Sequence, residues 1–272
     1  MIGAIIGDIA GSVYEFNNEK DKQNIAFFGD GHKFTDDSVL TIATADWILH
    51  GGDIASYYAK YGLKYRASYG GRFRSWLQAS RDGVASPYNS FGNGSAMRVS
   101  PVAWAFDTEE EVLQKAKESA ECTHNHPDGI AGAQAIALCI FMARKGKTKD
   151  EIRQAVEQRF YPLDFTTDEI RPSYGWRSER FGNSVWCSAS VPPAIVAFLD
   201  STDFVDCIRT AISLGGDSDT IAAMAGSIAQ AYYGVPAILH DVALQYLDSN
   251  LRDVVLEFEE KYVTSHSPSH TS

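Results

Sequence analysis

The stretch 215–236, GGDSDTIAAMAGSIAQAYYGVP, has an acidic start, an Ala-rich centre and a clear stop. Its centre, Ile221 to Tyr233, predicts a helix that Gly234-Val235-Pro236 would end. Pro236 suits the first turn of a next helix, expected over Ala237 to Leu247. Small residues inside helical runs indicate close helix packing, so this stretch favours one compact helical bundle.

The rest of the chain gives mainly helical signals. Apolar residues recur at helical spacing between Ile130 and Phe141, and Gly146 suits a helix stop. The pattern contains no series of alternating apolar and polar runs joined by tight turns, so strands are not expected. These signals predict an all-α fold. Further helix starts are expected at Asp53, at Thr108 with Glu111, and at Thr148 with Glu151.

The expected domain organisation is simple. One helical domain is predicted for residues 1–263, because no linker or internal repeat interrupts the chain. Residues 161–183 carry two prolines and are predicted to form a long irregular surface insertion. The Ser/His/Pro-rich tail, residues 264–272, is predicted to be disordered.

Composition limits the classes of function. The 272 residues are 44% hydrophobic and 22% charged, which is ordinary for a globular protein, and the formal net charge is -11. Such a surface repels phosphate backbones, so general nucleic-acid binding is not expected. The apolar start lacks a basic leader, and no apolar run approaches the roughly 20 residues that span a bilayer. A cytoplasmic protein with no membrane association is therefore expected. The four cysteines, expected to be reduced and mostly packed in the core, are Cys122, Cys139, Cys187 and Cys207.

Two acidic clusters stand at predicted helix starts. The first is Thr35-Asp36-Asp37-Ser38, before the helix-like run Val39 to Leu49, and the second is Asp217-Ser218-Asp219-Thr220. Either cluster alone is explained by helix capping, because Asp, Ser and Thr are preferred N-caps and acids favour the first turn. Together they exceed that need, since a cap uses one such side chain and close carboxylates repel one another unless a cation or a proton intervenes.

Both clusters offer only oxygen ligands. That chemistry suits a hard ion such as Mg²⁺, Mn²⁺ or Ca²⁺ and argues against structural zinc. Four carboxylates could hold two ions about 4 Å apart, as in two-metal hydrolytic sites.

Two shorter segments also carry polar side chains of interest. Glu15 follows the glycine-containing stretch 7–12 and is either a metal ligand or general acid/base, or a solvated loop glutamate. His124 and His126 stand two residues apart. With no Cys or third His nearby, a hydrogen-bonding or capping role is favoured over zinc.

A glycine-containing loop lies at residues 90–98, SFGNGSAMR. Gly92 and Gly94 would let backbone amides approach a ligand, and amides at a helix start make a phosphate cradle. The alternative is an ordinary loop in which Ser95 caps the next helix. Taken alone, this loop does not choose between the two.

In this order, the segments resemble the ADP-ribosylglycohydrolase family from Met1 to about Gly234. The resemblance implies an all-α fold, a single orthogonal helical bundle, with two Mg²⁺ or Mn²⁺ ions in a central cleft. Its most specific parts are Gly7-Asp8 through Glu15, Thr35-Asp36-Asp37, Gly92-Asn93-Gly94 with Met97-Arg98, and Gly216-Asp217-Ser218-Asp219-Thr220.

The resemblance also implies roles for individual residues, with Asp8 as a structural one. Ser38 stands where the family often has Thr, and the short segment between Glu15 and Thr35 leaves the acceptor undefined. The expected metal ligands are Thr35, Asp36, Asp37, Asp217, Asp219 and Thr220. The expected catalytic residues are Glu15, Asp36, Asp37 and Asp219. The residues expected to bind ADP-ribose are Ser90, Phe91, Asn93, Gly94, Ser95 and His124.

The implied activity is hydrolysis of the glycosidic bond between ADP-ribose and a modified acceptor. The ions would grip the ribose hydroxyls and position a water, while Glu15 or an Asp of the clusters handles the proton. The acceptor stays open between arginine, serine, nucleic acid and small-molecule conjugates. Two alternatives are a non-catalytic ADP-ribose-binding module and a Mg²⁺-dependent nucleotide phosphohydrolase. The protein is expected to be a monomer.

Overall fold

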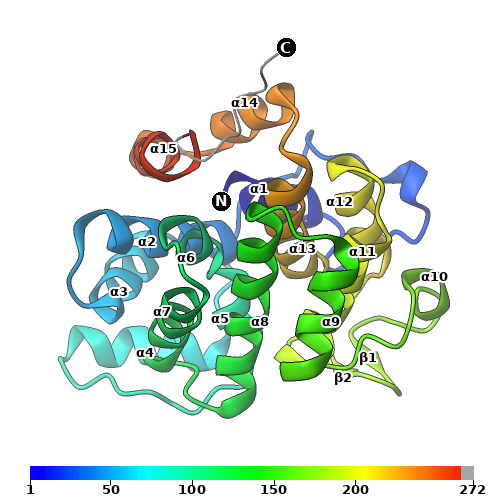
Figure 1. Cartoon of the computed structure of the whole chain (residues 1–272). Coiled ribbons are helices and arrows are strands. Elements are labelled where there is room, and N and C mark those ends of the chain that lie inside the picture. Colours follow the sequence, from blue (N-terminus) through cyan, green and yellow to red (C-terminus); the bar gives the residue numbers. More distant parts are fainter. Residues whose placement is uncertain (265–272) are drawn as a thin grey trace.

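A computed structural model describes residues 1–264 of the chain and has the predicted all-α fold (Figure 1). The helices of the first half are α1 (Ile2–Gly11), η1 (Lys22–Asn24), α2 (Asp36–His50), α3 (Ile54–Lys64), α4 (Gly71–Arg81), α5 (Gly94–Met97), α6 (Ser100–Ala105) and α7 (Glu109–Glu121). The elements of the second half are α8 (Pro127–Arg144), α9 (Lys149–Arg159), α10 (Thr167–Ile170), β1 (Arg177–Ser178), β2 (Gly182–Asn183), α11 (Cys187–Asp200), α12 (Phe204–Ser213), α13 (Ser218–Tyr233), α14 (Ala237–Tyr246), α15 (Ser249–Phe258) and η2 (Glu259–Val263).

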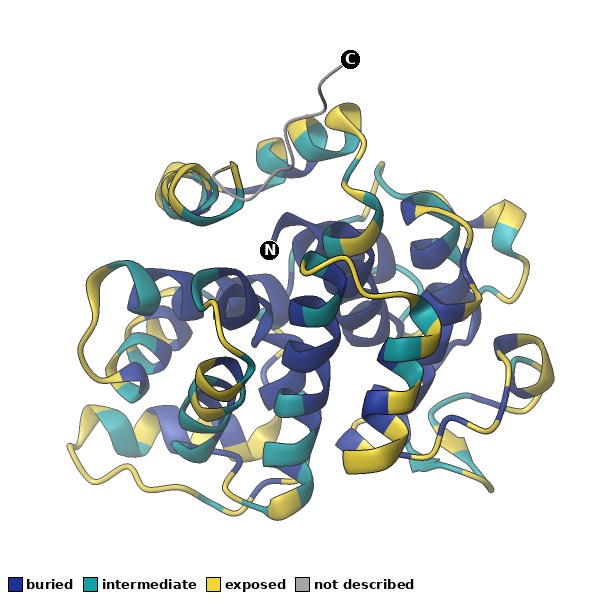
Figure 2. Ribbon diagram, viewed as in Figure 1, coloured by how far each residue is buried: buried dark blue, intermediate teal, exposed yellow. Residues whose placement is uncertain are grey.

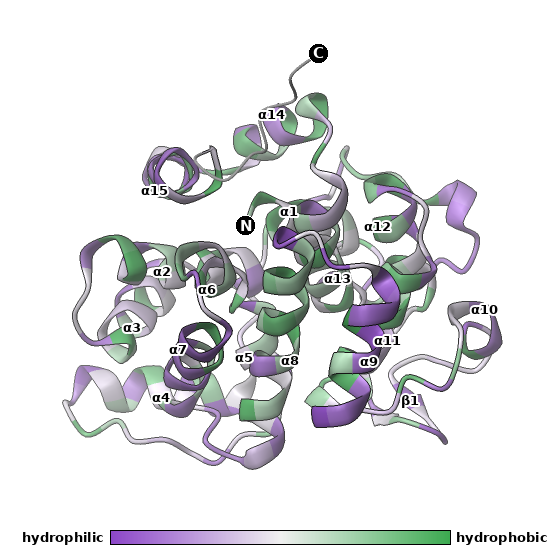
Figure 3. Ribbon diagram, in the orientation of Figure 1, coloured by the Kyte–Doolittle hydropathy of each residue, from purple (hydrophilic) through white to green (hydrophobic). Residues whose placement is uncertain are grey.

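Helices α1, α8 and α13 form the centre of the molecule. All ten residues of α1 are buried, and so are the first thirteen of α13, from Ser218 to Gln230. Figure 2 shows this centre as buried and the outer helices as mixed, and Figure 3 shows hydrophobic residues gathered on the same helices. The core is therefore built around α13, the helix that the stretch 215–236 predicts.

The backbones of α1 and α13 are in direct contact. A Cβ added to Gly3 would lie 2.3 Å from the carbonyl oxygen of Gly226, and one added to Gly7 would lie 2.1 Å from that of Ala222. Glycine at these positions lets the two helices approach more closely than any side chain would allow. The N-terminal turn of α13, with its two aspartates, is thereby fixed against the end of α1.

Most predicted helix starts are confirmed, with some boundary shifts. Both acidic clusters begin at the N-cap residue, Thr35 or Asp217, and continue into the first turn, because α2 already begins at Asp36 and α13 at Ser218. Asp53 caps α3, and the capping box at the start of α9 is complete. At α7, Thr108 accepts the Glu111 N–H, but the Glu111 carboxylate accepts the Thr108 hydroxyl instead of its backbone N–H.

The segment 161–183 differs from its prediction as an irregular surface insertion. It contains α10 and the antiparallel hairpin β1–β2. It also has buried apolar side chains that join the core. The prediction failed because these residues are scattered among prolines and polar residues, without helical or strand periodicity. The buried side chains are Tyr161, Leu163, Phe165, Ile170 and Tyr174.

Other expectations concern the thiols, the ends and the membrane. All four cysteines are free, three of them buried and Cys122 half-buried, as predicted. The boundary between a domain at residues 1–263 and a disordered tail stays a prediction, since residues 265–272 lie outside the described part. No helix within residues 1–264 is long and apolar enough to cross a membrane.

Candidate active site

One cavity of about 330 Å³ gathers ten of the thirteen residues predicted for the site. Its wall comes from the starts of α2, α5 and α13 and from the loops before them. Segments separated by up to about two hundred residues of sequence therefore meet at one place. The ten predicted residues in its wall are Glu15, Asp36, Asp37, Ser90, Asn93, Gly94, His124, Asp217, Asp219 and Thr220.

Three predicted residues lie outside the cavity wall. Thr35 is buried beneath it, as the N-cap of α2. Ser95 is fully buried, and its hydroxyl donates to the carbonyl of Gly129, 2.6 Å away. Phe91 packs edge-on against Trp186 beside the cavity, with a ring separation of 5.7 Å. The geometry gives Ser95 a role in holding the loop and no direct contact with the cavity.

Asp8 links the first acidic cluster to the core. It is fully buried at the end of α1, and its carboxylate accepts hydrogen bonds from the backbone N–H and the hydroxyl of both Thr35 and Ser38. The start of α2 is thus held on α1, which also contacts α13. The structural role expected for Asp8 fits these four contacts.

The two clusters also touch each other directly. The hydroxyl of Thr220 donates to Asp37 Oδ2, 3.2 Å away, across 183 residues of sequence. The amide of Asn93 donates to Asp217 Oδ2 at 2.7 Å and so orients that carboxylate. By contrast, Oδ1 of Asp37 is buried and has no hydrogen-bond partner among the described residues. A buried carboxylate oxygen without a donor is costly, and a bound cation would satisfy it.

The carboxylates crowd together strongly enough to disturb their ionisation. Burial, followed by repulsion from neighbouring carboxylates, raises the pKa of Asp36 to about 7 and that of Asp37 well above its usual range. The same causes raise the pKa of Asp219 well above its usual range. Burial and the charges of Asp217 and Asp36 raise the pKa of half-buried Glu15 to about 7. At neutral pH such a group needs protons or cations to be stable.

Two sets of three carboxylates are close enough to share an ion. Oxygens of Asp8, Asp37 and Asp219 lie within 4.8 Å of one another, and so do oxygens of Glu15, Asp217 and Asp219. Both sets include Asp219, which therefore stands between two possible ion positions. The donor atoms are all oxygens, as hard divalent ions prefer.

A second group of residues in the cavity wall is cationic. Arg72 and Arg98 both line it, beside Tyr88 and His124. Burial and the two arginines lower the pKa of His124 well below its usual range, so the imidazole is neutral at pH 7. Sequence reasoning did not assign Arg72 or Tyr88 to the site, and it used Arg98 only as part of a motif.

Arg98 is a fully buried charge. It donates to the carbonyl of Ser119 and the hydroxyl of Thr123, and its guanidinium lies 3.8 Å from the centre of the Tyr58 ring. Its Nε and Nη1 have no hydrogen-bond partner among the described residues. Because an unpaired buried cation is costly, the part of the cavity wall formed by Arg98 favours an anionic ligand.

The loop that carries Glu15 is held against the start of α13. The carbonyl of Glu15 accepts hydrogen bonds from Asn18 Nδ2 and from Trp176 Nε1, at 3.0 and 3.1 Å. Asn18 Oδ1 accepts the N–H of Gly216 at 3.0 Å. Lys20 donates to the carbonyls of three residues that lie near this loop: Arg171, Tyr174 and Leu214.

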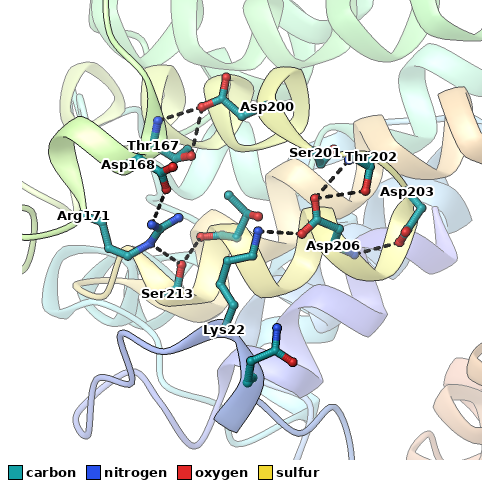
Figure 4. A network of polar contacts seen from close by, with 12 residues as sticks. Lys22, Thr167, Asp168, Arg171, Asp200, Ser201, Thr202, Asp203, Asp206 and Ser213 are labelled. Atoms are coloured by element: carbon teal, nitrogen blue, oxygen red, sulfur yellow. Dashed lines mark hydrogen bonds and ion pairs between the residues drawn. The ribbon is translucent and has the colours of Figure 1, made fainter.

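A polar network fastens the same region to α11 and α12 (Figure 4). Lys22 pairs with Asp206 of α12 at 2.6 Å. Arg171 donates to the hydroxyl of Ser213 at 2.9 Å, and Thr167 is bonded to Asp200 of α11. The Glu15 loop and the segment that contains Trp176 are therefore anchored on the same scaffold.

Comparison with known proteins identifies the family of this chain. A family model described as ADP-ribosylglycohydrolase matches residues 1–269. ADP-ribosylhydrolase ARH3 of Homo sapiens is 27% identical, over 88% of this chain and 85% of its own length. ADP-ribosylarginine hydrolase Tri1 of Pseudomonas putida is 26% identical, over 86% of this chain and 70% of its own length. A solved ADP-ribosylglycohydrolase-related protein complex shares the fold, with a TM-score of 0.70, 21% identity and 95% of both chains covered. Since the family model spans nearly the whole sequence, this chain belongs to the ADP-ribosylglycohydrolase family.

Proposed function

We propose that this protein hydrolyses the glycosidic bond between ADP-ribose and a modified acceptor, releases ADP-ribose, and uses two divalent cations, Mg²⁺ or Mn²⁺. The observation that carries the proposal is the meeting of the two acidic helix starts in one cavity, where Asp37 has a buried, unpartnered oxygen. The names of two relatives support the reaction class: one is an ADP-ribosylhydrolase, the other an ADP-ribosylarginine hydrolase.

The acidic end of the cavity would hold the cations. When bound, they supply Lewis-acid activation of water and orientation of the ribose hydroxyls. Thr35 is the least direct ligand of the proposed set, because it lies beneath the cavity wall. The proposed ligands are Thr35, Asp36, Asp37, Asp217, Asp219 and Thr220.

The charge gradient along the cavity orients the substrate. The amides of the loop 92–94 and the guanidinium of Arg98 favour the diphosphate, with Ser90 and neutral His124 beside it. The ribose that carries the acceptor then faces the carboxylates. Cleavage passes through a cation-like sugar, which nearby anionic oxygens of Asp36 and Asp219 stabilise.

Glu15 would handle the proton. A carboxyl whose pKa lies near 7 can take a proton from water or deliver one to the leaving group at neutral pH. It lines the cavity, and its carboxylate lies within 4.8 Å of Asp217 and Asp219. In the same proposal Asp36, Asp37 and Asp219 contribute by holding the ions.

The test is product identification by mass spectrometry. The protein is incubated with arginine- and serine-linked ADP-ribosyl peptides, with Mg²⁺, with Mn²⁺ and with a chelator. We expect intact ADP-ribose, and only with metal. Phosphate or AMP would instead indicate a nucleotide phosphohydrolase, and binding without turnover would indicate a binding module.

A variant pair connects the activity to the site. Asp219→Asn should reduce ADP-ribose release by more than the roughly 10- to 100-fold that is lost when residues behind metal ligands change. The matched control is Asp253→Asn, an exposed aspartate of α15 outside the cavity, which should keep wild-type activity. Full activity of Asp219→Asn would refute the assigned site.

A further inference from the structure

The segment 184–187, where the chain enters α11, is bound to the glycine-containing loop of the cavity. The N–H of Asn93 donates to the carbonyl of Val185 at 2.9 Å, and the N–H of Cys187 donates to the carbonyl of Phe91 at 3.0 Å. The two stretches also form an isolated antiparallel bridge. The backbone of the loop is therefore held in place by the backbone of this segment.

The first residue of the same segment contacts the turn that leads into α13. Ser184 Oγ accepts the backbone N–H of Asp217 at 3.2 Å. The packing is close here, because a Cβ added to Gly216 would lie 3.0 Å from that hydroxyl oxygen. Gly216 has a φ of +71°, a conformation that glycine adopts without strain. The Ser184 hydroxyl therefore fixes the backbone from which the Asp217 carboxylate extends.

Ser184 also acts on that carboxylate through Asn93. The carbonyl of Ser184 accepts a hydrogen bond from Asn93 Nδ2 at 3.2 Å, and the same amide donates to Asp217 Oδ2 at 2.7 Å. Ser190 Oγ is a further acceptor for this amide, at 3.2 Å. The hydroxyl of Ser184 thus holds the backbone of Asp217, and its carbonyl holds the amide that orients the Asp217 side chain.

Ser184 itself is separated from the cavity. It is fully buried and does not line the cavity wall. Its N–H donates to the carbonyl of Trp176 at 3.2 Å. All its hydrogen bonds within the described part of the chain therefore lead to residues that do line the cavity: Asn93, Trp176 and Asp217.

We infer that Ser184 is a positioning residue, which sets the place of the Asp217 carboxylate for metal binding without touching the metal or the substrate. This inference rests on the metal site of the proposed function. A ligand binds an ion well when its partners fix its position beforehand, and such partners contribute about 10- to 100-fold to metal affinity. Without the Ser184 hydroxyl, the buried N–H of Asp217 loses this acceptor, and the turn is free to move away from the ion position.

The experiment measures the Kd for Mn²⁺ by calorimetry in the wild type and in two variants of Ser184. Ser184→Ala removes the hydroxyl and keeps the carbonyl that holds Asn93, and it should raise the Kd at least about 10-fold. Ser184→Thr keeps the hydroxyl and should restore the wild-type Kd. A role in general stability would not be expected to separate these two variants in this way.

A matched control and a second variant separate metal positioning from stability. Ser227→Ala changes a buried serine of α13 that lies outside the cavity wall and whose hydroxyl donates to the carbonyl of Met224, so it should keep the wild-type Kd. Ser184→Gly removes the same hydroxyl as Ser184→Ala but should unfold at a lower temperature, because glycine loses more conformational entropy on folding. The two variants should nevertheless weaken Mn²⁺ binding equally. A Kd that instead follows the unfolding temperature across all variants would overturn the inference.

The possible failures can be told apart. If the wild type binds neither Mn²⁺ nor Mg²⁺, the proposed metal site fails, and the proposed function fails with it. If the wild type binds Mn²⁺ and Ser184→Ala binds it equally well, the metal site stands and the inference is overturned. If Ser184→Thr unfolds like the wild type but binds Mn²⁺ as weakly as Ser184→Ala, the hydroxyl is not the determinant, and the inference is again overturned.

Discussion

Replacing Gly7 by Ala tests how the core of this protein positions its carboxylates. The new Cβ would lie 2.1 Å from the carbonyl oxygen of Ala222, 0.9 Å short of the 3.0 Å below which such contacts essentially never occur. The obstacle is backbone, so no side chain can rotate away, and α1 must shift from α13 by nearly 1 Å. Overpacking of this kind costs up to about 3 kcal/mol, and the better helix propensity of Ala offsets about 1 kcal/mol. We expect a net loss of about 2 kcal/mol.

That loss corresponds to a fall in Tm of about 4–8 °C for a chain of this size. The assay is thermal and denaturant unfolding of Gly7→Ala beside Gly71→Ala. Gly71 has a negative φ and no atom within 4 Å of an added Cβ, so its variant should be as stable as wild type or gain up to about 1 kcal/mol. Equal stability of Gly7→Ala and wild type would refute the direct contact of α1 with α13.

Three further predictions concern the metal, pH and the Glu15 loop. Mg²⁺ or Mn²⁺ at about 100 times its Kd should stabilise the fold by about 2.7 kcal/mol, which a thermal-shift assay would detect as a rise in Tm. Asp37→Asn should abolish this rise in Tm. An unchanged rise in the variant would exclude Asp37 as a metal ligand. The hydrogen bond from His240 to Glu259 raises the pKa of His240 to about 9. This pairing therefore stabilises the fold fully at pH values below the unfolded-state pKa of about 6.5, and the stabilisation is lost as the pH rises through 9. His240→Gln should thus be less stable than wild type at pH 6 and equal to it at pH 10, as urea unfolding at each pH would show; a constant difference would contradict the pairing. Lys20→Met removes three hydrogen bonds that hold the Glu15 loop. The variant should have a kcat at least about fivefold lower and an unchanged affinity for ADP-ribose. A loss of affinity with unchanged kcat would contradict a positioning role for Lys20.

The acidic clusters were predictable because their chemistry is local. Each cluster carries more carboxylates than a helix start needs, and the sequence alone shows this excess in Thr35-Asp36-Asp37 and in Asp217-Ser218-Asp219. The helices behind them were equally visible from their small apolar residues. Both helix starts were placed three residues late, since a cluster of caps and acids does not mark which residue begins the first helical turn.

The remaining site residues depend on tertiary contacts. Trp176 lies in a segment without periodicity, and only the folded chain brings it to the carbonyl of Glu15. Arg72 reaches the cavity from the start of α4, a helix for which the sequence offered no functional motif. The family resemblance implied that Ser95 binds the ligand, but in the structure its hydroxyl donates to the carbonyl of Gly129. Side-chain direction of this kind is set by packing and cannot be derived from spacing along the chain.

The glycine-mediated contact of α1 with α13 has a consequence for how this protein can change. The relative position of the Asp8 and Asp219 carboxylates is dictated by main chain touching main chain, with almost no side-chain volume in between. Substitutions in the peripheral helices can then accumulate without altering the separation of those two groups. Protein engineering that changes surface residues, grafts new loops or raises solubility should therefore keep Gly3, Gly7 and Gly11. The exposed residues of the peripheral helices can be redesigned.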